Sequence, residues 1–178
     1  MPKEVTPDRS IEPASRELVI TRIFDAPREL VFAAFTDPQH LMKWWGPHGC
    51  TVISCDADAR PGGTWCISMR SPRVLPQFVQ RNPINLDSSR ENQWIVERQR
   101  GVYREVVTPE RLVFTYAFED DVGRPLHQTV VTVGFAEEGS RTKVTLHQAI
   151  FETVTARDDH MRGWTEALEH LAAYLVQV

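Results

Sequence analysis

The sequence predicts an α+β fold in which a curved seven-stranded antiparallel sheet carries two short helices and a long C-terminal helix across its concave face. Three observations lead to this prediction. A strand-like run near the start is followed at once by two short helical patterns. Six segments of alternating or β-branched character come next. An amphipathic helical pattern then runs almost to the C-terminus.

Local signals bound the first strand and both short helices. Residues 18–24 are apolar and β-branched, which favours a strand. Pro27 suits the first position of a helix, and apolar residues recur after it at helical spacing. Asp37-Pro38 can cap and start a second helix, which Gly46-Pro47 ends.

The sheet is predicted to continue as an antiparallel meander, because turn residues separate neighbouring strand candidates. Pro61-Gly62-Gly63 and Glu137-Glu138-Gly139-Ser140 are two of these joints. The six strand candidates are Val52–Ala59, Thr64–Arg70, Val102–Val107, Leu112–Glu119, Gln128–Phe135 and Thr142–Gln148.

A final helix is predicted over about residues 156–176. Thr155 and Asp158 form a capping-box pattern at its start. Its apolar residues share one face, which needs the sheet as a cover. That face consists of Met161, Trp164, Leu168, Leu171, Ala172 and Leu175.

Length and charge limit the class of protein. The chain has 178 residues, a formal net charge of -4 and a pI near 5.9, which argues against nucleic acid as a partner. We expect one domain over residues 17–178, preceded by a flexible tail over residues 1–16 that contains Pro2, Pro7 and Pro13. Neither a signal peptide nor an apolar run of about 20 residues is visible, so we expect a cytoplasmic protein without membrane insertion.

Residues with reactive side chains do not form an enzyme motif. The chain has no nucleophile elbow, phosphate-binding glycine loop, dinucleotide fingerprint or His-Glu-x-x-His helix. Cys50, Cys55 and Cys66 lack the spacing of a zinc or redox site. We therefore expect no catalytic residue, no metal and no cofactor. Tyr103 and Glu105 share a strand face and form either a structural hydrogen bond or a pair that polarises a carbonyl, and the structural interpretation is favoured.

A set of short strings lies in order along the chain: residues 18–36, Trp44-Trp45-Gly46-Pro47, Arg60-Pro61-Gly62-Gly63-Thr64-Trp65, Gly101-Val102-Tyr103-Arg104-Glu105, Pro109-Glu110-Arg111-Leu112-Val113-Phe114-Thr115, and Gly163-Trp164 with Leu168 and Leu171. Together they resemble the activator of heat-shock protein 90 ATPase homologue branch of the SRPBCC, or START-like, superfamily, in its stand-alone bacterial form. The resemblance covers roughly residues 17–177. It implies the helix-grip (START/Bet v 1-like) fold, whose cavity between sheet and long helix accepts apolar molecules in various members.

One departure from the family is the segment at about residues 71–100, where relatives have a much shorter hairpin. Pro72 and Pro76 break regular structure there, whereas Phe78 and Trp94 need cover. We expect the segment to lie beside the cavity mouth. Three interpretations remain open: a mobile loop, a lid over the cavity, or an arm that packs on the second subunit of a homodimer.

Binding of a small hydrophobic or aromatic ligand is the function that the resemblance favours. The alternatives are a co-chaperone-like interaction domain that acts on a chaperone ATPase, and a cofactor-free enzyme of the cyclase or dehydratase type. Trp164 either fills the core or lines the cavity, and the two roles can coexist. The residues expected in the ligand cavity are Trp44, Trp65, Met69, Tyr103, Phe114, Tyr116, Val131, Trp164, Leu168 and Leu171.

Overall fold

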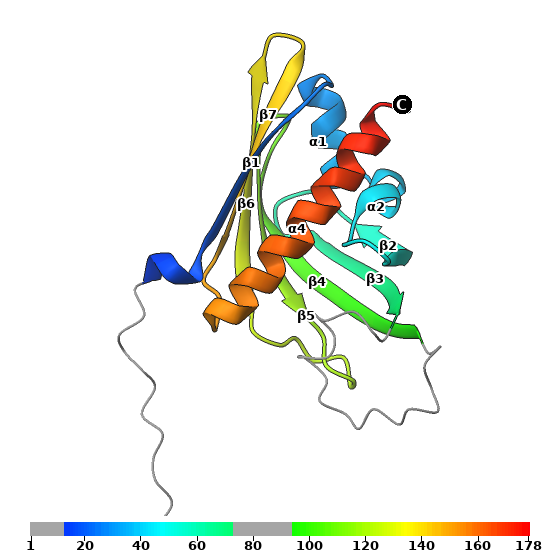
Figure 1. Ribbon diagram of the computed structural model, residues 1–178, viewed down its shortest axis with the longest axis vertical. Coiled ribbons are helices and arrows are strands. Elements are labelled where there is room, and N and C mark those ends of the chain that lie inside the picture. Colours follow the sequence, from blue (N-terminus) through cyan, green and yellow to red (C-terminus); the bar gives the residue numbers. More distant parts are fainter. Residues whose placement is uncertain (1–12, 73–93) are drawn as a thin grey trace, which may run out of the picture.

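The computed structural model describes residues 13–72 and 94–178 (Figure 1). A short 3-10 helix, η1 (Pro13–Arg16), lies in the stretch that the sequence assigns to the N-terminal tail. The elements that follow are β1 (Leu18–Phe24), α1 (Arg28–Thr36), α2 (Pro38–Trp44), β2 (Thr51–Ala57), β3 (Thr64–Pro72), β4 (Trp94–Val107), β5 (Arg111–Phe118), β6 (Thr129–Glu138), β7 (Arg141–Ala149) and α4 (Val154–Leu175).

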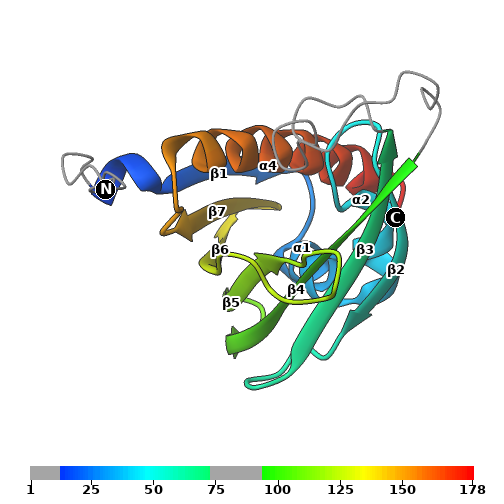
Figure 2. The same ribbon diagram turned by 90° about the horizontal axis from the view of Figure 1, so that it is seen from below.

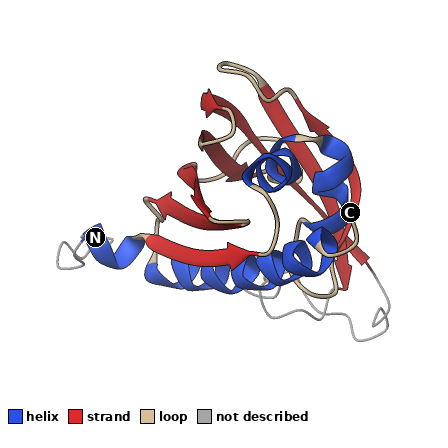
Figure 3. Cartoon of the chain, turned by 90° about the horizontal axis from the view of Figure 1, so that it is seen from above, coloured by secondary structure: helices blue, strands red, loops and turns tan. Residues whose placement is uncertain are grey.

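The seven strands form one sheet in the order β1-β7-β6-β5-β4-β3-β2, and every neighbouring pair is antiparallel. Strands β2 to β7 are a simple meander, and β1 pairs with the last strand of that meander. The sheet curves strongly, and the helices lie on its concave side (Figures 2 and 3). Helix α4 contacts both α2 and β1. The predicted fold class is confirmed.

The predicted helix start is confirmed for α2 but not for α1 or α4, since Pro27, expected at the first helical position, is the N-cap of α1 and has extended backbone. The Asp37 carboxylate accepts a 2.8 Å hydrogen bond from the backbone N–H of Gln39 and caps α2 as expected. The expected cap of the long helix at Thr155 is wrong. Helix α4 begins earlier, and the hydroxyl of Thr153 accepts from the N–H of Ala156 at 3.0 Å. Thr155 therefore lies within the first helical turn.

The inward faces of the strands build the core as predicted. Side chains from β3, β5, β6 and β7 alternate toward α4 and are buried. Leu168 and Leu171 of α4 cover this surface, so most of the concave side is filled by packed side chains. The inward residues with almost no exposed surface are Ile67, Leu112, Val131, Val133, Val144 and Leu146.

A notch in the sheet at Gly101 fixes the position of Trp65. The indole Nε1 of Trp65 donates a 3.1 Å hydrogen bond to the carbonyl of Thr115, and so reaches from β3 past β4 to β5. A Cβ on Gly101 would lie 1.7 Å from that carbonyl oxygen and 2.4 Å from the indole nitrogen. Only glycine leaves room for this contact.

Strands β3 and β4 extend into the segment predicted as a long loop. Residues 71–72 end β3 and residues 94–100 begin β4, with Pro72 paired to Trp94. The predicted bounds of 71–100 are therefore too wide. The start of β4 alternates in the unexpected sense, because Trp94 and Val96 are exposed and Gln99 is buried. The lid and dimer-arm interpretations concern residues 73–93, which lie outside the described residues. No helix in the described ranges combines the length and apolarity needed to span a bilayer.

Candidate functional site

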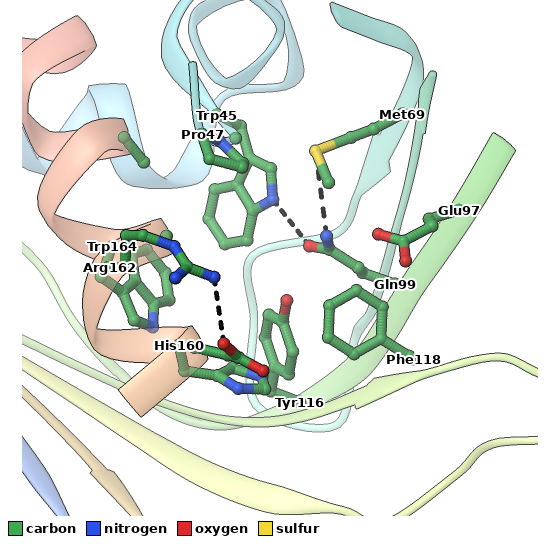
Figure 4. A pocket seen from close by; sticks show the side chains of 14 residues that line it. Trp45, Pro47, Met69, Glu97, Gln99, Tyr116, Phe118, His160, Arg162 and Trp164 are labelled. Carbon is green, nitrogen blue, oxygen red and sulfur yellow. Dashed lines mark hydrogen bonds and ion pairs between the residues drawn. The ribbon is translucent and has the colours of Figure 1, made fainter. Parts of the chain in front are cut away.

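A small cavity lies between α4 and the concave face of β3, β4 and β5, at the end where α2 leads into β2 (Figure 4). Its volume is about 60 Å³. An engineered cavity of roughly 150 Å³ admits benzene, so this one holds less than a ring without adjustment. The lining residues are Trp45, Gly46, Pro47, Met69, Glu97, Gln99, Tyr116, Phe118, Asp159, His160, Arg162, Gly163, Trp164 and Ala167.

Two tryptophans form one wall. Trp45 follows the last residue of α2, and its ring meets the Trp164 ring of α4 at a centroid distance of 5.1 Å and 76°. The Trp45 ring also approaches Trp44 and Trp65, at 5.4 and 5.7 Å. Such tilted and edge-to-face contacts stabilise aromatic pairs beyond simple burial. These ring contacts stabilise the indole wall.

Both indole N–H groups of that wall are engaged. Trp45 Nε1 donates to Gln99 Oε1 at 2.8 Å, and Trp164 Nε1 donates to Gln148 Oε1 at 2.7 Å. Because an indole nitrogen is only a donor, these contacts also decide which atom of each glutamine amide is the oxygen.

Strand β4 supplies the polar groups of the sheet side. Glu97 and Gln99 are two residues apart, so their side chains lie on the same face of the strand, toward the cavity. Gln99 is only 2% exposed. Its Nε2 lies 3.8 Å from the thioether sulfur of Met69 on β3.

Helix α4 supplies the opposite side. Arg162 Nη2 lies 3.0 Å from Asp159 Oδ1 in an ion pair at the helix surface. His160 Nδ1 donates to the carbonyl of Ala156 at 2.8 Å. Its ring packs against aromatic rings that include Tyr116 at 5.5 Å. A Cβ built on Gly163 meets no atom within 4 Å, so the helix leaves open space at this residue.

Of the ten residues predicted for the cavity, the structure places three in its lining: Met69, Tyr116 and Trp164. The other seven are buried in the core around it: Trp44, Trp65, Tyr103, Phe114, Val131, Leu168 and Leu171.

Hydrogen bonds hold the two other predicted tryptophans in the core, outside the cavity lining. Trp44 Nε1 donates to the carbonyl of Ala34 at 2.8 Å and holds α2 against α1. Trp65 donates to Thr115, as described above. The neighbouring Trp45 takes the position at the cavity instead.

The pair Tyr103 and Glu105 does not form. A register shift in the β4–β5 pairing falls between these two residues. Glu105 instead makes an ion pair with Arg111 at 3.1 Å, near the surface. Tyr103 is buried, and burial raises the pKa of its phenol above the ordinary value. These two residues therefore offer no joint group to polarise a carbonyl.

Several lining residues were not predicted from the sequence, among them Glu97, Gln99, Gly163 and Ala167. Gln99 was missed because its segment was assigned to a loop. In the folded strand, Glu97, Gln99, Gly101 and Tyr103 alternate with more exposed residues. The reversed polarity of that alternation concealed the strand.

Metal binding and thiol reactivity are the other kinds of chemistry to consider among the described residues. No group of three or more His, Cys, Asp or Glu side chains is arranged to hold a metal ion there. Burial, aided by the charge of Glu97, raises the pKa of the Cys50 thiol to about 11. Burial raises the pKa of Cys55 to about 12. These thiols are protonated near neutral pH, and thiols of this kind are poor nucleophiles.

Wider hollows on the surface are less suited to a ligand. One of about 500 Å³ borders the turn after β5, and its walls include the exposed residues Val96, Arg98, Asp121 and Leu126. Another of about 520 Å³ lies between α2 and the end of α4. The small cavity differs because the buried amide of Gln99 lies beside buried aromatic rings in its wall, and small-molecule sites combine apolar walls with a few placed polar groups.

Comparisons with known proteins agree with this architecture. The family described as Activator of Hsp90 ATPase homolog 1-like protein matches residues 25–176. Among curated proteins, no sequence matches the chain.

Solved structures from several bacteria share the fold. An AHSA1 protein from Silicibacter pomeroyi is 25% identical over 90% of this chain and 98% of its own, with a TM-score of 0.72. A protein from Chromobacterium violaceum is 26% identical over 90% and 96% of the two chains, with a TM-score of 0.68. An AHSA1-like protein from Aeromonas hydrophila, at 19% identity over 90% and 92%, has a TM-score of 0.63.

Proposed function

The chain belongs to the Activator of Hsp90 ATPase homolog 1-like family, and we propose that it binds a small hydrophobic or aromatic group in the cavity between α4 and β3–β5. The observation that carries this proposal is the open space beside Gly163, bounded by the faces and edges of buried aromatic rings. Small-molecule sites are concave and are lined mainly by aromatic and apolar side chains with a few placed polar groups, as this cavity is.

The size of the cavity sets the kind of ligand. A group that buries about 100 Å² of apolar surface gains about 2.5 kcal/mol at roughly 25 cal/mol per Å². The cavity of about 60 Å³ therefore takes a small molecule weakly, or the end of a longer one whose remainder lies at the mouth. Tight binding needs contacts in addition to the apolar ones.

The test uses α-methylstyrene, an uncharged apolar probe whose isopropenyl end enters the cavity while its ring lies at the mouth, in an NMR titration. The indole N–H signals of Trp45 and Trp164 report directly on the cavity wall. We expect both signals to move and to saturate. Gly163→Leu extends a side chain into the open space and should abolish these shifts.

The matched control is Thr165→Leu, which adds a leucine to an exposed position two residues further along α4. This variant should bind the probe like the unmodified protein. Equal binding by Gly163→Leu and Thr165→Leu would contradict the proposal, as would indole shifts that grow without saturation. Native mass spectrometry of the purified protein supplements the test, because a co-purified molecule would reveal the natural ligand.

A further inference from the structure

We infer that Gln99 is the polar anchor of the cavity, and that its ligands carry a hydrogen-bond-accepting oxygen, such as a ketone, aldehyde or amide carbonyl, on an apolar body. This inference rests on the proposed function and specifies the chemical class of the ligand. It begins from the amide of Gln99, which lies in the wall between Trp45 and Met69 (Figure 4).

The orientation of this amide is determined by its neighbour. Trp45 Nε1 can only donate, so the atom that it meets at 2.8 Å is the oxygen of Gln99. Nε2 is therefore on the other side of the amide and faces Met69 Sδ. The direction of the donor does not depend on a choice between two equivalent amide orientations.

The donor is poorly satisfied. An amide nitrogen carries two N–H groups, and a thioether sulfur is a weak acceptor. Within residues 13–72 and 94–178, the sulfur of Met69 at 3.8 Å is the sole acceptor that Nε2 meets. The second N–H has none in that part of the chain. Since Gln99 is 2% exposed, solvent offers little compensation for this deficit.

A ligand oxygen would supply the strong hydrogen-bond acceptor that Nε2 of Gln99 lacks among the described residues. A carbonyl oxygen at 2.7–3.2 Å from Nε2 would satisfy the donor in a water-poor site, where an amide–carbonyl hydrogen bond is stronger than in water. The indole N–H groups of Trp45 and Trp164, which also belong to the wall, are already engaged. The aromatic walls then hold the apolar part of the ligand. Selection arises because an analogue without the oxygen leaves the amide unsatisfied.

The test compares two probes of nearly equal shape. Acetophenone carries a carbonyl where α-methylstyrene carries a carbon–carbon double bond. The readout is the ratio of the two dissociation constants, α-methylstyrene over acetophenone, measured by NMR titration. Gln99→Met keeps an unbranched side chain and removes the amide. We expect the ratio to fall about tenfold in this variant, because a net hydrogen bond of typical strength is lost.

A second variant and a direct measurement keep the test independent of Gln99→Met folding well. Trp45→Phe removes the N–H that orients the amide, and should lower the ratio about threefold. In the unmodified protein, the side-chain amide signals of Gln99 should shift with acetophenone and not with α-methylstyrene.

The outcomes separate the two proposals. If neither probe binds, the proposed function fails. If both bind, the ratio is unchanged in Gln99→Met and the Gln99 amide signals respond equally to the two probes, the cavity binds ligands but the anchor is refuted.

Discussion

The indole Nε1 of Trp164 donates a 2.7 Å hydrogen bond to Oε1 of Gln148 and joins the long helix to strand β7. The relay continues from Gln148 Nε2 to the hydroxyl of Thr129 at 2.8 Å, and from that hydroxyl to the carbonyl of Tyr116 at 3.4 Å. All four residues are buried. One chain of polar groups thus ties α4 to β7, β6 and β5.

Breaking this relay at Gln148 should destabilise the protein. Gln148→Leu leaves the N–H of Trp164 buried without an acceptor, so we expect a loss of about 1–3 kcal/mol in the free energy of unfolding. Combining it with Trp164→Phe removes donor and acceptor together. The sum of the losses of unfolding free energy in the two single variants should then exceed the loss in the double variant, as measured by urea denaturation. Simple additivity would contradict a functioning hydrogen bond between the two side chains.

A substitution at Leu168 tests whether this position belongs to the packed core or to the cavity lining. It is 1% exposed and does not line the open space, although its neighbour Ala167 does. Leu168→Ala should therefore lower the free energy of unfolding by about 2–5 kcal/mol. Met161→Ala, at a half-buried position of the same helix, is the control and should lose less. A loss below about 1 kcal/mol at Leu168 would mean that the cavity extends deeper than described.

Two glycines should respond to alanine in opposite directions. Gly163→Ala places a methyl group in open space within a helix and should stabilise the protein by about 0.5–1 kcal/mol. Gly101→Ala drives a methyl group into the Thr115 carbonyl and should destabilise it strongly. Thermal unfolding measures both. A stabilised Gly101→Ala protein would show that the Trp65–Thr115 contact is dispensable.

The free energy of unfolding should fall at alkaline pH because the thiols of Cys50 and Cys55 have raised pKa values in the folded protein. The pKa of Cys50 is raised to about 11 and that of Cys55 to about 12, above the ordinary value of 9.0. The thiols of the unfolded chain therefore ionise at a lower pH than those of the folded protein. The stability that these thiols contribute is thus complete below pH 9 and is lost as pH rises through 11–12. Urea midpoints of the unmodified protein should fall in this window more than those of the Cys50→Ala/Cys55→Ala variant. Parallel curves would contradict the raised pKa values of the two half-buried thiols.

Much of the fold could be predicted because local signals and burial agree in most elements. Strands such as β5 place Leu112, Phe114 and Tyr116 inward at period two, and Asp37 caps α2 where its sequence position suggests. These signals are local, so a single sequence contains them. The cap at Thr153 was misplaced because two threonines of similar propensity lie two residues apart, and only the path of the chain after β7 selects between them.

The site was less predictable, since it depends on how elements distant in sequence approach one another. Trp44 and Trp45 are equivalent in composition, yet the first bonds to Ala34 and the second to Gln99. That choice is set by the angle at which the chain leaves α2. Gln99 carries no apolar signal, and Gly163 is visible as part of the cavity only once the helix is placed over the sheet.

The reversed alternation at the start of β4 makes this strand locally frustrated. A shift of register by one residue would bury Trp94 and Val96, but it would also bury Arg98 and Arg100 and expose Tyr103. Two further contacts fix the observed register: the close approach of the Thr115 carbonyl to Gly101 and the hydrogen bond from Trp45 to Gln99. The register of β4 is therefore set by its exposed arginines and by Gln99 and Gly101, and not by the apolar residues at its start.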